Sequence, residues 1–166
     1  MSFASRLSLV PTALASLLLV VACSSSDGSD TGSSSGQTQG TTCEKDTRKD
    51  VYTAGLAKQT SAGEKLTVKI VESTPSPPKK GTNTMMLEIA DAAGKPVDGA
   101  TVSVVPYMPD HAHGSALTPV VTPMGMGRYD VTKIYYPMPG LWKVTVTVQM
   151  TGAAPQDVAF NFCFDG

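Results

Sequence analysis

The segment LWKVTVTVQM, residues 141–150, decides the fold because apolar and polar side chains alternate along it. One face carries the apolar residues Trp142, Val144, Val146 and Val148. The other face carries the polar residues Lys143, Thr145 and Thr147. A period of two is that of a β-strand with one buried face. The segment therefore predicts a half-buried strand, in which the chain's only tryptophan, Trp142, is a core anchor rather than a ligand-binding aromatic.

Other segments of the chain alternate in the same way, whereas helical periodicity is nearly absent. The residues expected to face inward are Leu66, Val68, Ile70, Met85, Leu87, Ile89, Ala100, Val102, Val104, Tyr129, Val131, Ile134, Tyr136, Val158, Phe160, Phe162 and Phe164. Alternation slips near Thr132, which indicates a bulge, and a further strand is expected around Val120 and Val121. Short strands separated by turn residues predict an immunoglobulin-like antiparallel β-sandwich of about seven strands.

Two segments are expected to lie at the surface, outside this pattern. Residues 72–83, ESTPSPPKKGTN, are rich in proline, which a central strand does not accommodate. Residues 44–50, EKDTRKD, mix both signs of charge and are expected to be solvated. Residues 43–166 have the length of one domain and contain no internal repeat.

The N-terminus predicts export and a lipid anchor. Residues 1–22 contain one cation, Arg6, and an apolar run at 14–22 that is shorter than the ~20 residues of a membrane span. The VVAC sequence that ends at Cys23 resembles a bacterial lipobox, which implies cleavage before Cys23 and its acylation. Residues 23–42 are then a lipidated cysteine and a tether of Ser, Gly and Thr, which lacks the apolar surface needed to fold.

The net charge of the chain bears on its expected partners, and the residue after Cys23 bears on the membrane in which it is expected. Without Arg6, twelve basic and fourteen acidic residues remain, a formal charge of about −2, so nucleic acid is not an expected partner. Ser24 replaces the aspartate that signals inner-membrane retention in the enteric sorting rule. This favours the outer membrane, with the domain facing the periplasm.

Two cysteines remain after Cys23 is assigned to the lipid: Cys43 and Cys163, at the two ends of the folded part. Exported proteins meet an oxidising compartment in which paired thiols persist, so a Cys43–Cys163 disulfide is expected. The alternative is that both thiols are soft metal ligands.

Both histidines of the chain lie in PYMPDHAHGS, residues 106–115. If the backbone is extended there, His111 and His113 project to the same side and form a workable pair for one metal ion. Methionines Met108, Met124, Met126 and Met138 lie in this loop or in the turns that follow.

Thioethers and imidazoles together select copper over hard cations, and Asp110 and Asp130 are candidates to orient an imidazole ring. The alternative is that the methionines fill gaps in the core and that the histidines only bond to the backbone.

Two longer stretches, VPYMPDHAHGS at 105–115 and GMGRYDVTKIYYPMPGLWKVTVTV at 125–148, resemble the YtkA-like domain, which is related to FixH-like proteins. The resemblance covers about residues 64–150, and the termini look like a lipoprotein subgroup. It implies an immunoglobulin-like sandwich and makes Met108, His111, His113 and Met138 the positions of a copper site. The family usually has glycine or another small residue between the histidines, and Ala112 is a mild departure.

Three classes of function follow. The first is an envelope protein that binds, buffers or hands over copper without catalysis. The second is a structural or protein-interaction module of the envelope, which docks a partner through an exposed surface around Tyr107, Tyr135 and Tyr136. An enzyme is not expected, because no Ser-His-acid context or phosphate-binding loop is present.

Overall fold

The computed structural model describes residues 43–165, so the expected signal peptide, Cys23 and the tether lie outside the described residues. Within them, the elements are η1 (Cys43–Lys45), β1 (Leu56–Gln59), β2 (Thr67–Thr74), β3 (Gly81–Ala90), β4 (Thr101–Met108), η2 (Pro109–His111), β5 (His113–Gly114), β6 (Val120–Gly125), β7 (Arg128–Tyr136), β8 (Gly140–Gln149) and β9 (Gln156–Phe164). None of the helices in this range is long and apolar enough to cross a membrane.

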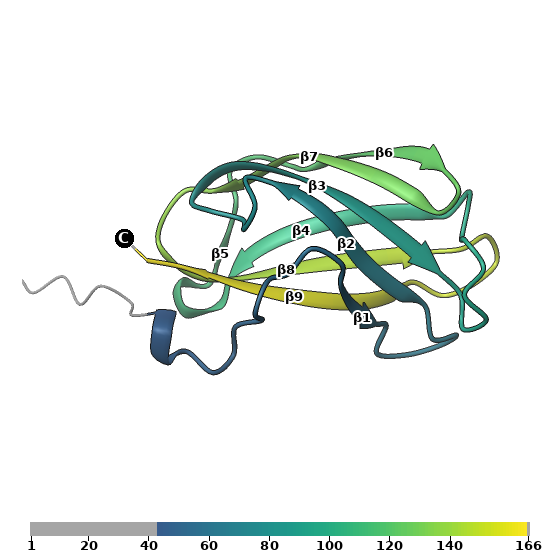
Figure 1. The fold of residues 1–166 in the computed structure, drawn as a ribbon, viewed down its shortest axis with the longest axis horizontal. Helices are drawn as coiled ribbons and strands as arrows, with labels where there is room; N and C mark the ends of the chain where they lie inside the picture. The colour runs from purple at the N-terminus through teal and green to yellow at the C-terminus, as the bar shows by residue number, and fades with distance from the viewer. Residues whose placement is uncertain (1–42, 166) are drawn as a thin grey trace, which may run out of the picture. The chain divides into compact units, whose positions relative to one another are not determined.

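The strands form two antiparallel sheets, as expected for a β-sandwich. Sheet A has the order β1-β2-β3-β7-β6, and sheet B has the order β5-β4-β8-β9. Figure 1 shows β3, β7 and β6 in one layer above β4, β8 and β9 in the other. The end of β4, strand β5 and the C-terminus lie at one end of the sandwich, and the β6–β7 hairpin lies at the other (Figure 1).

The predicted strand pattern is confirmed by the core. On β8, the alternate residues Trp142, Val144, Val146 and Val148 are buried. They lie beside the buried residues of β9 in the same sheet, and share one core with those of β2, β3 and β7 in the other sheet. Each large apolar side chain contributes ~1.5–3 kcal/mol on burial. The alternation along the sequence is therefore enough to determine which face of each long strand packs inward.

The predicted slip in alternation on β7 is a β-bulge. Asn83 pairs with Ile134 and Met85 pairs with Val131, so two residues of β7 lie opposite one residue of β3. Lys133 takes a positive φ of 57°. The extra residue lets Val131 and Ile134 both face the core, although they are three positions apart.

The disulfide expected between the two ends of the domain is present, with the Cα atoms of Cys43 and Cys163 5.4 Å apart. Both sulfurs are in the bond, so neither cysteine is a thiolate ligand. Cys163 lies between the buried Phe162 and Phe164 and projects to the outer side of sheet B, as its place in the alternation predicts.

The charged part of the N-terminal arm, residues 44–50, is exposed or half-buried, as expected, but the arm (residues 43–55) is also hydrogen-bonded to sheet B. The Asp50 amide donates to the Asn161 carbonyl at 2.8 Å, and the Asn161 amide donates to the Asp50 carboxylate at 2.7 Å. The arm therefore covers the outer edge of β9, and an edge strand with free polar groups is protected from other chains.

A close contact between β4 and β8 generates a prediction about stability. Gly140 has a φ of +122°, and a Cβ added there would overlap the methyl group of Met108. Gly140→Ala should lower the free energy of unfolding by about 2–4 kcal/mol, because backbone strain and overpacking add. Gly152→Ala is the matched control, since Gly152 has a φ of +78° with open space around it. It should cost only about 1 kcal/mol.

Urea unfolding of both variants with the disulfide intact measures these costs. Equal losses of stability in the two variants would show that the Met108 contact contributes nothing.

Candidate metal centre

The loop that carries both histidines is a tight turn rather than the extended segment that the sequence suggested. Residues 109–111 form the 3-10 helix η2, and Ala112 then takes left-handed values of φ 53° and ψ 36°. His113 and Gly114 return as the two-residue strand β5, which pairs with the end of β4. The reversal at Ala112, not strand alternation, therefore brings the two histidines to the same place.

The two imidazole rings lie side by side. Their centres are 5.8 Å apart, and the ring planes are inclined at 77°. An ion bonded to one nitrogen of each ring at ~2.0–2.1 Å would place the ring centres roughly 5–6.5 Å apart, for bond angles from tetrahedral to linear. The observed separation fits two imidazoles that share one ion.

The backbone sets the tautomer of His113. Its Nδ1 lies 3.0 Å from the Gly114 carbonyl oxygen. A carbonyl only accepts hydrogen bonds, so Nδ1 donates and Nε2 keeps a free lone pair. Donation from the non-ligating nitrogen to a carbonyl is the usual arrangement of a metal-binding histidine. The structure thus presents His113 in a form suited to binding through Nε2.

Strand pairing places Met108 next to His113. The two residues are direct partners in the β4–β5 pair, so their side chains project from the same face of sheet B. Met108 is only 1% exposed, and its side chain fills the space left by Gly140. Met108 is therefore a core residue that also lies directly beneath His113 on the inner face of sheet B.

Trp142 joins the loop to the turn that carries Met138. Its indole ring is fully buried and lies edge-on to His113, with ring centres 5.7 Å apart. Its Nε1 donates to the Met138 carbonyl oxygen at 3.1 Å. Met138 is half-buried and packs against the same core cluster. Trp142, which was predicted only as a core anchor, thus contacts both the His113 ring and the backbone of the Met138 turn.

The two aspartates considered as partners of an imidazole ring have other roles. Asp110 accepts two hydrogen bonds from Arg48, at 2.7 and 2.8 Å, and these hold the pKa of its carboxyl below the usual value. Asp130 lies on β7 between the buried Tyr129 and Val131, so it faces away from the core. Among residues 43–165, neither carboxylate forms a hydrogen bond with an imidazole ring, so the structure does not support either residue as an orienting acceptor.

Two methionines considered near the site lie far from it. Met124 and Met126 are 59% and 72% exposed. They belong to the β6–β7 hairpin, at the end of the sandwich opposite β5 (Figure 1). Their proximity to the histidines in sequence is not proximity in space.

Residues 43–165 contain no group of three or more histidine, cysteine, aspartate or glutamate side chains placed to hold a metal ion. An ion at the histidine loop would therefore depend on two imidazoles and on thioether sulfur. Zinc sites are built from thiolates, carboxylates and several imidazoles. The donor set fits copper better than zinc.

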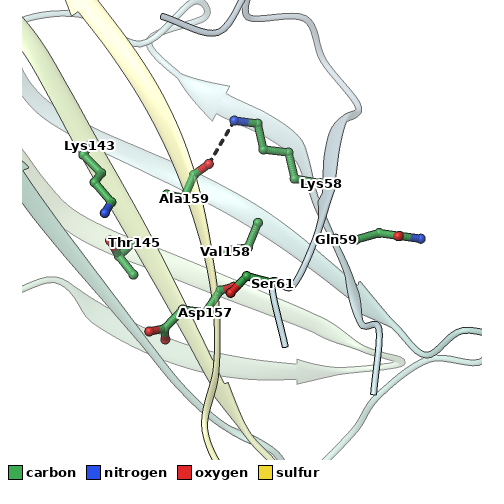
Figure 2. Close-up of a pocket in the computed structure, with 8 residues that line it drawn as sticks. All are labelled: Lys58, Gln59, Ser61, Lys143, Thr145, Asp157, Val158 and Ala159. Atoms are coloured by element: carbon green, nitrogen blue, oxygen red, sulfur yellow. Dashed lines mark hydrogen bonds between the residues drawn. The ribbon is translucent and has the colours of Figure 1, made fainter. Parts of the chain in front are cut away.

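A groove of about 460 Å³ lies between β1 and the outer face of β8 and β9. Figure 2 shows Lys58 bonded to the Ala159 carbonyl across this groove, at 2.9 Å. The Asp157 carboxylate in its wall accepts a hydrogen bond from Thr147 at 2.6 Å. None of the eight lining residues is a histidine, cysteine or methionine, so the groove adds no donor to the candidate site.

Comparison with known proteins gives a family match that includes the histidine loop. The YtkA-like family model matches residues 60–147, a range that includes β2 to most of β8 and the whole histidine loop. The chain belongs to the YtkA-like family. The family predicted from the two stretches around the histidines and Trp142 is thus confirmed, while membership of a lipoprotein subgroup stays a prediction. Neither curated proteins nor solved structures gave a match.

The left-handed conformation of Ala112 generates a prediction about the loop. A β-carbon at positive φ costs energy, and a β-branched residue costs more. Ala112→Gly should be neutral or stabilising by up to about 1 kcal/mol, whereas Ala112→Val should cost more than about 1 kcal/mol.

Thermal and urea unfolding measure both variants. The exposed Ala116, which lies outside the positive-φ residues, supplies the control substitutions Ala116→Gly and Ala116→Val. The same response at positions 112 and 116 would contradict the assigned backbone conformation.

Proposed function

We propose that the protein is a lipid-anchored component of the bacterial cell envelope that binds copper and buffers or hands over the ion without catalysis. Its ligands are His111 and His113, with Met108 and Met138 as sulfur donors. The tether carries the domain away from the membrane, and the loop lies at one end of the domain. The protein faces the periplasm from the outer membrane.

The observation that carries this proposal is the cluster formed by His111, His113 and Trp142 over Met108. Ring centres 5.8 Å apart match two imidazoles on one ion. Met108 projects from the same face of the sheet as His113. Imidazole and thioether donors together favour copper, and the thioethers favour its Cu(I) form.

The chain's only tryptophan lies against His113 and serves as the reporter for the test. The exported chain with Cys23→Ser is titrated with Cu(II) while Trp142 fluorescence is followed, and with Cu(I) in competition with a chelator. One equivalent of Cu(II) should quench most of the emission. His111→Ala/His113→Ala should abolish the quenching and lower the Cu(I) affinity at least 100-fold.

The matched control is Met124→Ala/Met126→Ala, which removes two exposed thioethers at the far end and should bind like the wild type. Met138→Leu should weaken Cu(I) more than Cu(II), because a thioether prefers the softer ion. Copper binding that survives loss of both histidines would refute the site.

An apolar patch supports a second candidate function, docking of an envelope protein. Val105, Tyr107 and Leu117 are 54%, 39% and 44% exposed, and they lie on β4 and the segment after β5. Tyr136, expected in such a surface, is fully buried, and Tyr135 is half-buried. Docking through this patch would persist in the double histidine variant, which distinguishes it from a copper function.

The anchor is tested separately from the metal. Cys23→Ser should move the protein from the membrane fraction to the soluble periplasmic fraction, because a lipidated cysteine is the proposed attachment. Metabolic labelling with a fatty acid should mark the wild type alone. Cys23→Ser protein that stays with the membrane would exclude this cysteine as the anchor.

A further inference from the structure

Arg48, on the N-terminal arm, holds the turn that carries His111. Its Nη1 and Nη2 donate to the two oxygens of Asp110, at 2.7 and 2.8 Å. Its Nε and Nη2 donate to the carboxylate of Asp46, at 3.0 and 2.7 Å. The guanidinium thus bridges two carboxylates that are far apart in sequence, and one of them precedes His111 directly.

The arm itself is fixed to sheet B on both sides of Arg48. The disulfide joins Cys43 to Cys163 on β9. Beyond Arg48, Asp50 exchanges hydrogen bonds with the Asn161 backbone and also accepts from Lys58 at 2.6 Å. The Arg48 carbonyl accepts a hydrogen bond from the Asn161 side chain at 2.9 Å. Arg48 is therefore presented to the loop from a rigid support.

Apart from Trp142 and Met108, which lie against His113, the histidine loop has few other restraints. Strand β5 is only two residues long, and η2 contributes no buried residue. His111 is exposed at the end of η2, so core packing does not fix its position. A single exposed ion pair is worth little, but a forked arginine held between two carboxylates meets the conditions under which such pairs become effective.

We propose that Arg48 is a positioning residue for the imidazole pair, so that the disulfide-bonded arm is part of the copper site. This inference rests on the proposed function. Arg48 touches neither histidine in this role; it fixes Asp110, and through η2 it fixes the direction of His111. The arm, which lies outside the range matched by the family model, then sets the affinity of a loop inside that range.

The direction in which Arg48→Gln changes the copper affinity distinguishes a positioning role of Arg48 from a purely electrostatic one. A cation near a copper site repels the ion, so Coulomb's law alone predicts that Arg48→Gln tightens copper binding. Positioning predicts the opposite. Arg48→Gln should weaken binding about three- to tenfold, the range expected when an effective exposed ion pair is lost.

The experiment measures Cu(I) and Cu(II) affinities of the exported chain carrying Cys23→Ser, together with amide hydrogen exchange of residues 109–115 without metal. The variants are Arg48→Gln, Asp110→Asn, their double, and the charge swap Arg48→Asp/Asp110→Arg. Both single variants should bind more weakly and exchange faster. The double variant should bind copper no more weakly than either single variant, because all three lose the same interaction. The charge swap should restore part of the affinity.

Lys69→Gln is the matched control, since it removes the partly exposed ion pair between Lys69 and Glu88 on sheet A. It should leave affinity and loop exchange unchanged. Wild-type copper binding with unchanged or tighter binding in Arg48→Gln would overturn the positioning role and leave the proposed function intact. A wild type that binds no copper would overturn the proposed function, and the inference with it.

Discussion

The contact of Trp142 with its surroundings is the constraint on which this end of the molecule depends. The indole ring is buried against Tyr136, with ring centres 5.5 Å apart, and its edge meets His113. Its N–H group donates to the Met138 carbonyl oxygen, so this polar group is buried with its hydrogen bond made. One core side chain on sheet B thus contacts the histidine loop, the Met138 turn and Tyr136 on sheet A.

The histidine loop is supported from two directions. From inside, Met108 fills the space that Gly140 leaves and forms the floor beneath His113. From outside, Arg48 fixes Asp110 from an arm that the disulfide and Asp50 hold against β9. Metal ligands need such support, because a site whose surrounding shell is loose loses affinity. A loop that is short and exposed thereby has contacts on both its inner and its outer side.

The sequence predicted the long strands well and the loop poorly. Alternation identified the inward face of β8, β9 and β7, including the slip at the bulge. It missed β1 and β5, because strands of four and two residues contain too few positions to show a period. The candidate ligands were predicted from residue type and from the family resemblance. Their assembly by a left-handed turn at Ala112 was not, since an alanine gives no sign of positive φ.

The sequence by itself determined the sandwich, the inward face of each long strand, the disulfide partners and the family. The sandwich and its inward faces follow from the local period, the disulfide partners from the count and position of the cysteines, and the family from its motifs, all of which are read from the linear chain. Only the tertiary structure decided that Met124 and Met126 lie far from the histidines, that Asp130 faces outward and that Arg48 meets Asp110. These facts depend on pairings between residues distant in sequence, 62 positions apart for Arg48 and Asp110. No local pattern specifies such a pairing, because it arises only when separate elements pack on a common core.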